Sequence, residues 1–378
     1  MITEQFVLLP DDKEIEEFYF IPDLILIFIS PFFSNIKILK QYREIYPNSI
    51  ITGCTTAGEI EDISVHLDSA VITAVRFDKS KVVYNEVQIS SPQDGEAAGA
   101  ELVEKFEQEG LKHIYVLSEG IAINGSDLVS GLANHISTDF SVTGGFAADG
   151  FRAQKTFILN NEFSFVQNTL VGIGFYGEEL KVGYGTLDGL NSLGVDRIVT
   201  KSEKNVVFEI DGEPALDLLN RLIGAISINN SDSIVLLPLS VREKVTDSPI
   251  IRSIKNFDTI ENSITFTGNI PEGSYIRLMK SNVDRLINAA EGAAEVSIEP
   301  IGNTHTDLVI ITSCIGRRKV LKGLVEEEVE AVRDVVGEDA TITGFYSYGE
   351  ISPYIYGNEC KLQNQSIIVT SFSESDIE

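Results

Sequence analysis

The chain of 378 residues carries one pattern of apolar and polar positions three times. Each copy opens with an almost wholly apolar run that ends at a serine, which predicts a buried strand. Apolar residues then recur at intervals of three and four, the spacing of an amphipathic helix. A second apolar run leads into a glycine turn, and a third closes the copy. The opening runs are 23–30, 113–118 and 307–313, and the helical segments are 35–46, 126–137 and 320–337.

The order strand, helix, strand predicts a βαβ unit in each copy. Its crossover is right-handed in nearly all known proteins, so we expect the first two strands to be parallel. The turns after both strands then leave one sheet edge, where open α/β sheets bind ligands. This places Ser30, Ser118 and Ser313 beside the three glycine turns. The turns begin at Gly53, Gly144 and Gly344, and the closing strands are 69–77, 168–177 and 365–373.

A region of different character, about 205–300, separates the second and third copies. It predicts a strand, turn and helix, then strands at 233–240, 263–268 and 274–281 and a helix at 283–296. In the copies, Ser126 is a predicted helix N-cap and Gly337 a predicted helix end. The predicted fold class is α/β, with repeated βαβ-type units, mixed sheets and two packed domains. The predicted domains are 1–205 and 206–378.

The charge balance narrows the classes of partner. Lys and Arg total 29 against 57 Asp and Glu, a formal charge of -28, which repels nucleic acid and anionic lipid. The apolar run 18–33 is interrupted by Pro22, Asp23 and Pro31, so we expect a buried strand and no membrane insertion. The N-terminus lacks the cationic start of a secretory signal. Three cysteines without a CxxC pair predict neither disulfides nor a zinc site, so we expect a cytoplasmic protein without metal or cofactor.

The stretch GCTTAGEI at 53–60 has the glycine spacing of a phosphate loop. Such a loop ends in Gly-Lys-Ser or Gly-Lys-Thr, because the lysine must reach the terminal phosphates. Here Gly58 is followed by Glu59, whose carboxylate would repel a polyanion. The sequence therefore disfavours nucleotide binding at this turn.

Five segments together resemble the FIST family of bacterial and archaeal sensory modules, which have an N-terminal and a C-terminal part. They are GCTTAGEI, GGFAADG, EIDGEPAL, SCIGRRKVLKGLVEEEV and GFYSYGEISPY, in the family's order, and the resemblance covers about residues 23–356. It implies intracellular sensing of a small molecule such as an amino acid. It also implies a signal passed to a separate output protein, such as a kinase, cyclase or chemoreceptor. One subgroup of the family resembles haem-binding sensors of nitric oxide.

Charged residues near the turns are candidates for holding a zwitterion. Glu59 and Glu350 each follow a glycine, six residues beyond the leading glycine of their copy, and can receive an ammonium or brace the turn. In the middle copy Asp149 precedes its glycine instead. Arg317, with the helix N-terminus after Ser313, is a candidate carboxylate clamp, or a solvated surface charge. Arg252 matches a family segment and is the second cationic candidate.

The cysteines and tyrosines of the turns leave more than one role open. Cys54 and Cys314 are candidate nucleophiles, but neither has an evident base. Such cysteines more often line a pocket or fill the core. Tyr346 and Tyr348 share one face of an extended segment and form a ligand wall or fill the core. The full set of predicted ligand-binding residues is Gly53, Cys54, Thr55, Thr56, Glu59, Gly145, Asp149, Arg252, Ser313, Cys314, Arg317, Tyr346, Tyr348 and Glu350.

The sequence thus predicts a non-catalytic sensor that binds a small molecule, an amino acid or similar zwitterion. Two alternatives stay open. One is a small cytoplasmic hydrolase or transferase that uses a loop cysteine, and the other is a haem-based gas sensor. A haem iron would need an axial ligand from the histidines His66, His113, His135 and His305.

Overall fold

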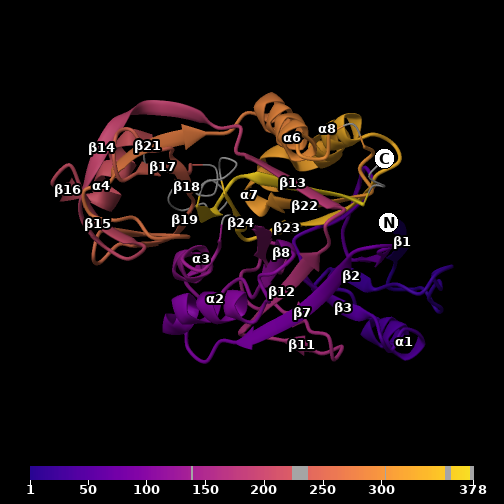
Figure 1. Cartoon of the computed structure of the whole chain (residues 1–378). Coiled ribbons are helices and arrows are strands. Elements are labelled where there is room, and N and C mark those ends of the chain that lie inside the picture. The colour runs from indigo at the N-terminus through magenta and orange to yellow at the C-terminus, as the bar shows by residue number, and fades with distance from the viewer. Residues whose placement is uncertain (138, 224–236, 303, 354–358, 375–378) are drawn as a thin grey trace.

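The computed structural model describes residues 1–137, 139–223, 237–302, 304–353 and 359–374. These residues form three six-stranded sheets and one eight-stranded sheet, with helices packed against the sheets (Figure 1). The predicted α/β class with mixed sheets and two packed parts is confirmed. No described helix has both the length and the apolar character needed to cross a membrane.

Each copy of the repeat contains three main strands and a hairpin. Copy one comprises β2 Leu24–Ile29, α1 Ile36–Ile45, β3 Ile50–Thr55, the hairpin β4 Glu59–Glu61 and β5 Ser64–His66, and β6 Ala70–Arg76. Copy two comprises β8 Leu111–Ser118, α3 Gly125–Ala133, β9 Ser141–Phe146, the hairpin β10 Ile158–Leu159 and β11 Phe165–Val166, and β12 Thr169–Tyr176. Copy three comprises β22 Leu308–Cys314, α7 Ile315–Leu321, α8 Val325–Val336, β23 Thr341–Ser347, the hairpin β24 Glu350–Pro353 and β25 Cys360–Gln363, and β26 Ile367–Glu374.

The predicted parallel pairing of the first two strands is confirmed in all three copies. Gly53, Gly144 and Gly344 lie opposite equivalent residues of the first strands, Ile27, Val116 and Ile311. A Cβ on these glycines would stand 1.8, 1.9 and 2.1 Å from the carbonyl oxygen opposite. The leading glycines are therefore required because the neighbouring strand approaches their Cα atoms closely.

The three sheets exchange hairpins in a ring. The hairpin β4–β5 of copy one pairs with β23 of copy three, and β24–β25 of copy three pairs with β9 of copy two. The hairpin β10–β11 of copy two returns to β3 of copy one and closes the ring. The edge strands β1 Ile2–Leu8, β7 Lys81–Gln88 and β13 Leu180–Leu187 precede the copies and pair with β6, β12 and β26. All three sheets thus have the same strand order.

The serines that end the three opening runs are not equivalent positions in the structure. The amide of Ser30 donates to the carbonyl of Ser69, and the same bond is made by Glu119 to Thr169 and by Cys314 to Ser366. Ser30 therefore corresponds to Glu119 and Cys314. The similar serine endings of the apolar runs concealed this offset, which only the ladder hydrogen bonds fix.

Of the two predicted helix ends, one is confirmed and one is wrong. Gly337 ends α8 with a φ of 87°. The N-cap of α3 is Asn124, whose side chain accepts from the amide of Ser126 at 3.0 Å, so the cap lies two residues before the prediction.

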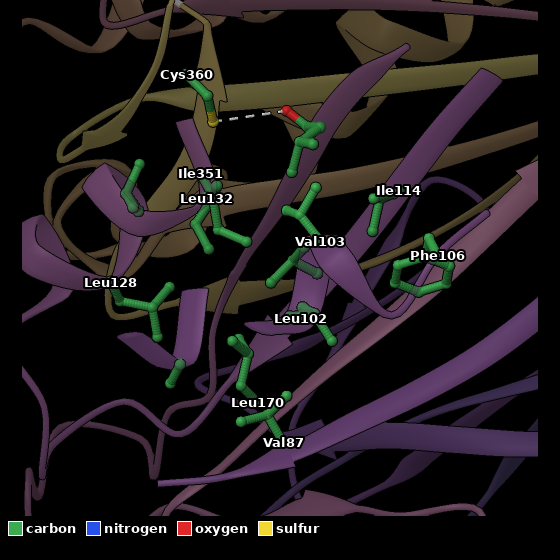
Figure 2. Close-up of a cluster of buried hydrophobic side chains, with 14 of the residues drawn as sticks. Val87, Leu102, Val103, Phe106, Ile114, Leu128, Leu132, Leu170, Ile351 and Cys360 are labelled. Carbon is green, nitrogen blue, oxygen red and sulfur yellow. Dashed lines mark hydrogen bonds between the residues drawn. The ribbon is translucent and has the colours of Figure 1, made fainter. Parts of the chain in front are cut away.

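Each sheet of the ring packs one face against helices and the other against a shared centre. In β2, Leu24, Leu26 and Phe28 face the central cluster, while the alternate residues face the cluster under α1. The pair α6 Val283–Ile298 and α8 covers the sheet of copy three, and α2 Gly95–Glu104 with α3 covers that of copy two. Figure 2 shows the latter cluster, in which Ile351 and Cys360 of the exchanged hairpin lie among copy-two side chains.

The eight-stranded sheet is inserted between β13 and α6, and thus interrupts the third repeat (upper left in Figure 1). Its elements are β14 Asn191–Glu203, β15 Val206–Ile210, β16 Glu213–Pro214, α4 Ala215–Ile223, β17 Leu239–Arg242, β18 Ile250–Arg252, β19 Ile254–Asp258, β20 Ser263–Phe266 and β21 Tyr275–Lys280. Residues 233–236 of one predicted strand lie outside the described residues. The domain division near residue 205 stays a prediction.

Candidate functional site

The carboxylates of Glu59 and Glu350 are buried at the starts of two exchanged hairpins. Glu59 is 1% exposed and accepts hydrogen bonds from Thr56 and, at 2.8 Å, from Ser69. Glu350 is fully buried and accepts from Ser347 and Ser366, each at 2.8 Å. Burial raises the pKa of both carboxyls to about 7. In both copies the carboxyl therefore joins the second-strand turn to the start of the closing strand.

In copy two a different carboxylate takes a related place. Glu119, 1% exposed, accepts from the hydroxyl of Thr156 at 2.5 Å and from the amides of Ile121 and Ala122 at 3.0 and 2.8 Å. Glu119 is absent from the predicted site residues, because the serine endings of the apolar runs point to Ser118, one residue earlier. An alignment of the three first strands by their glycine-paired residues would have indicated Glu119.

Asp149, the predicted carboxylate of copy two, orders the turn that follows β9. It accepts from the amides of Gln154 and Lys155, each at 2.8 Å, and from the hydroxyl of Tyr348. The hydroxyl oxygen of Tyr348 also accepts a hydrogen bond from the amide of Ala153 at 3.0 Å. Burial raises the pKa of the Tyr348 phenol, so the hydroxyl keeps its proton for Asp149.

Three predicted residues, Ser313, Arg317 and Tyr346, meet around Glu328. The guanidinium of Arg317 lies 2.6 Å from the Glu328 carboxylate, and both side chains are fully buried. Ser313 and Tyr346 donate to the same carboxylate at 2.8 and 3.0 Å. Glu328 was missed, although it shares the buried stripe of α8 with Val329 and Val332.

Nη1 and Nη2 of Arg317 also donate to the carbonyls of Asp188 and Leu286, at 2.9 and 2.7 Å. Its charge is thus met by protein groups. Arg318, the next residue, is the cation beside Glu59: it donates to the carbonyl of Ala57 and its charge lowers the pKa that burial raises.

Arg252 fastens the inserted sheet to the ring. Its guanidinium donates to the carbonyls of Ile251 and Leu362 at 3.0 and 2.9 Å, and burial lowers its pKa to about 10. The side chain is 4% exposed. The contact with Leu362 ties β18 to the exchanged hairpin of copy three.

Cys54 and Gly145 face the centre of the ring. A Cβ on Gly145 would stand 2.6 Å from Thr312, and the ring of Phe345 stacks on Phe28 at 4.7 Å. Cys54 lies in this central cluster, where burial raises the pKa of its thiol. The hydroxyl of Thr55 accepts from the amide of Phe157 at 3.0 Å. Gly53, Cys54, Thr55 and Gly145 are thus held in strand pairing and packing.

A cavity of about 260 Å³ lies where copy two, copy three and the inserted sheet meet. It opens at the carboxyl ends of β8 and β22, the edge at which α/β sheets bind ligands. Cys314 and Tyr348 are the predicted site residues among its described lining. Its apolar wall is formed by Ile121, Ile123, Phe146, Ile254, Ile315 and Leu362. Its polar groups include Ser253, Thr267, Asn364 and Gln365, with Lys255 exposed at the margin.

Two other cavities lack this combination of walls. One of about 290 Å³ inside the inserted sheet is almost wholly apolar. Another of about 490 Å³ lies by Ser141 and Val142, at the opposite, amino-terminal end of β9. The cavity at the junction, hereafter the junction cavity, is therefore the candidate site.

The Cys314 thiol borders the junction cavity. Burial, and then the negative charge of Glu350, raise the pKa of this thiol. A protonated thiol is a weak nucleophile, because the thiolate is the reactive form. In this arrangement Cys314 is soft lining beside a carboxyl.

The predicted haem alternative depends on the histidines, which lie apart. His113 is buried in the central cluster region, contacts Ser141 and Thr143 at 2.7 and 2.9 Å, and has its pKa lowered to about 3 by burial. His66 and His305 lie beside Glu61 and Asp307. None of these histidines is among the described lining of the junction cavity.

This α/β ring with an inserted sheet carries a cavity at the junction of its parts. The chain belongs to the FIST family: residues 23–213 match the FIST N domain and residues 215–353 the FIST C domain. FIST domains are sensory domains. The recognition made from the five sequence segments is thereby confirmed.

Two further comparisons give more distant likenesses. An uncharacterized protein of Methanocaldococcus jannaschii is 26% identical over 240 residues, which is 55% of this chain and 44% of the relative. The chain thus spans less than half the length of that relative. The structure of cyanuric acid hydrolase from A. caulinodans aligns with 10% identity and a TM-score of 0.23, covering 78% of this chain and 68% of the hydrolase. A second cyanuric acid hydrolase structure aligns with a TM-score of 0.25 and 9% identity, covering 79% and 69%.

Proposed function

We propose that the protein is a cytoplasmic small-molecule sensor whose ligand binds in the junction cavity. The observation that carries this proposal is the origin of the cavity's walls, which come from copy two, copy three and the inserted sheet. A ligand in such a place contacts all three parts at once. A sensor works when its ligand binds one arrangement of those parts more tightly than another, because the ligand then shifts the balance between them.

Hydrogen bonds beside the cavity hold the inserted sheet to the ring, and these are the contacts that a ligand would change. Thr267 of the inserted sheet donates to Asn364 at 2.6 Å, and both residues line the cavity. The backbone amide of Asn269 donates to the hydroxyl oxygen of Ser126 at 2.9 Å, which joins the same sheet to α3. A bound molecule that competes for Thr267 or Asn364 changes how firmly the inserted sheet is held.

The lining favours a small amphipathic ligand. Apolar side chains surround neutral hydroxyl and amide groups, and among the described lining Lys255 is the cationic side chain. Ligand pockets usually measure about 300–1,000 Å³, so this cavity fits a molecule smaller than a typical drug. An amino acid or similar zwitterion would place its apolar side chain inside and its carboxylate toward Lys255.

Within this proposal, Glu59, Glu350 and Arg317 stabilise the turns and make no ligand contact. Their partners in the protein are hydroxyls, backbone carbonyls and Glu328. The candidate binding residues are Cys314, Tyr348, Thr267, Asn364 and Lys255. The signal passes to a separate output protein such as a kinase, cyclase or chemoreceptor, and the proposal requires no catalytic step.

The experiment is native mass spectrometry of the purified protein, followed by calorimetry with a panel of amino acids and amines. Ile121→Trp fills the cavity and should weaken binding by about tenfold or more, because a ligand and the indole cannot share the space. Ile45→Trp, at the exposed end of α1, is the matched control and should bind as the parent does. Equal binding by both variants at unchanged melting temperature would show that the ligand binds elsewhere.

A further inference from the structure

Two loops and the helix α7 meet on the carboxyl-end face of the ring and place cations over aromatic rings. The guanidinium of Arg152 lies 4.0 Å from the ring centroid of Phe32. Arg318 and Lys319 lie 5.2 and 5.5 Å from the ring centroid of Phe151. Phe32 follows β2, Phe151 and Arg152 follow β9, and Arg318 and Lys319 lie in α7. These five residues are called the cationic patch below.

Arg152 and both rings of the patch are exposed, while Arg318 and Lys319 are half-buried, and the charge of the patch opposes that of the molecule. Phe151 is 56% and Phe32 41% exposed, although large aromatic rings are usually buried. Two carboxylates on neighbouring turns, Asp149 and Glu59, are 3% and 1% exposed. The exposed Asp68, bonded to Ser30, stands at the margin. The patch therefore presents positive charge in a chain of net charge -28.

We propose that the cationic patch docks an acidic segment, with apolar side chains among its carboxylates, of a partner protein. Arginine and aromatic side chains are the residues that most often dominate binding at protein interfaces. The cations here lie over aromatic rings, so they lose little freedom when a carboxylate approaches. Negative charge elsewhere repels an acidic segment, which restricts its docking to the patch.

The patch also shares a loop with the junction cavity, and this link rests on the proposed sensing function. Tyr348 lines the cavity, and its hydroxyl contacts Asp149 and, at 2.9 Å, the carbonyl of Gly150. Phe151 and Arg152 follow at once. Ala153 then donates its amide to Tyr348 and also lines the cavity. A ligand that moves Tyr348 therefore moves the two patch residues between these contacts.

The first experiment measures docking in the absence of ligand. The probe is a rhodamine-labelled peptide in which Glu and Leu alternate, and its binding is followed by fluorescence anisotropy at low and high salt. The double variant Arg152→Glu with Lys319→Glu should weaken binding by about tenfold or more, and added salt should weaken the parent's binding. Lys37→Glu with Lys40→Glu makes the same charge change on exposed positions of α1 and should bind as the parent does.

Two outcomes would overturn the docking surface. One is equal peptide binding by the patch variant and the α1 variant. The other is a change of oligomeric state in the patch variant without a change in peptide binding, which would make this face an interface between copies of the chain. Phe151→Ser keeps all the patch charges and should still weaken binding of the Glu–Leu peptide. Binding of a peptide of Glu alone should weaken less.

A second measurement separates this inference from the proposed function. Peptide binding is repeated with the small molecule that calorimetry identifies. If the small molecule does not change peptide binding, the link through Tyr348 is contradicted, whereas the docking surface itself is not. Docking that fails in the ligand-free protein, while the molecule still binds in the cavity, contradicts the patch alone.

Discussion

Glu59 and Glu350 occupy equivalent positions in two copies of the repeat, and each carboxyl is held by two hydroxyl side chains. Both are almost fully buried, and burial raises the pKa of each to about 7. From this paired placement we expect the ring to respond to pH at two of its three turns. It also argues that the carboxyls brace the exchanged hairpins, since each begins or adjoins a hairpin strand.

The first prediction is that stability falls as the pH rises toward and through 7. An unfolded glutamate releases its proton near about pH 4.3, whereas the folded carboxyls keep theirs to about pH 7. The folded state therefore binds more protons in this window, and its extra stability is complete below the window and lost above it. Glu59→Gln and Glu350→Gln mimic the protonated form, so they should be more stable than the parent at about pH 8 and similar to it at about pH 5.

Urea unfolding across this pH range measures the effect. Glu327→Gln, an exposed change on α8, is the control and should follow the parent. Parallel stability curves for the parent and the two buried variants would contradict the assigned pH window.

The second prediction concerns the buried ion pair of Arg317 and Glu328. Removal of one partner leaves a buried charge, so Arg317→Ala should cost about 3–5 kcal/mol of unfolding free energy. Arg317→Met combined with Glu328→Gln removes both charges and should recover much of the loss. Arg221→Ala breaks an exposed pair with Glu213 and should cause no measurable loss. Denaturant unfolding decides, and an Arg317→Ala protein as stable as the parent would show that the guanidinium is not needed for folding.

The third prediction tests the glycines of the ring. Gly53→Ala and Gly144→Ala put a methyl group within 1.8 and 1.9 Å of a carbonyl oxygen, so the paired strands must separate. We expect a loss of about 3 kcal/mol or more, or insoluble protein. Gly323→Ala, where no atom lies within 4 Å, is the control. Comparable stability of all three variants, measured by thermal melting, would refute the close approach of the strands.

The repeat was predictable because two independent features recur in each copy, the apolar periodicity and the glycine turn. The parallel strand pairs followed from chirality. The exchange of hairpins did not, because strand order between copies depends on contacts such as Glu59 with Phe345 that no local pattern encodes. The sequence does not distinguish an insertion from the start of a second domain, since a chain that leaves a sheet after β13 and returns at α6 looks the same locally.

The candidate site was less predictable than the fold. Residue types suggested charged ligand contacts at Glu59 and Arg317, but burial and internal partners decide whether a charge faces a ligand, and these depend on tertiary packing. Cys314 and Tyr348 do border the cavity. Thr267 and Asn364 come from elements far apart in sequence, and nothing in either segment indicates that they meet.

The fourth prediction separates a sensor from an enzyme at Cys314. The thiol's raised pKa has two causes, burial and the charge of Glu350, so alkylation by iodoacetamide should be slow at neutral pH. Glu350→Gln removes the second cause and should speed the labelling of Cys314 at about pH 8.5, a result that packing alone does not give. Cys314→Ser identifies the labelled site by mass spectrometry and, for a sensor, should bind the ligand within about tenfold of the parent. An enzyme with a cysteine nucleophile would behave in the opposite way. Its thiol would take an acyl-substrate analogue rapidly and in near-stoichiometric yield, Glu350→Gln would slow that reaction by removing a proton acceptor, and such a result would overturn the non-catalytic function proposed here.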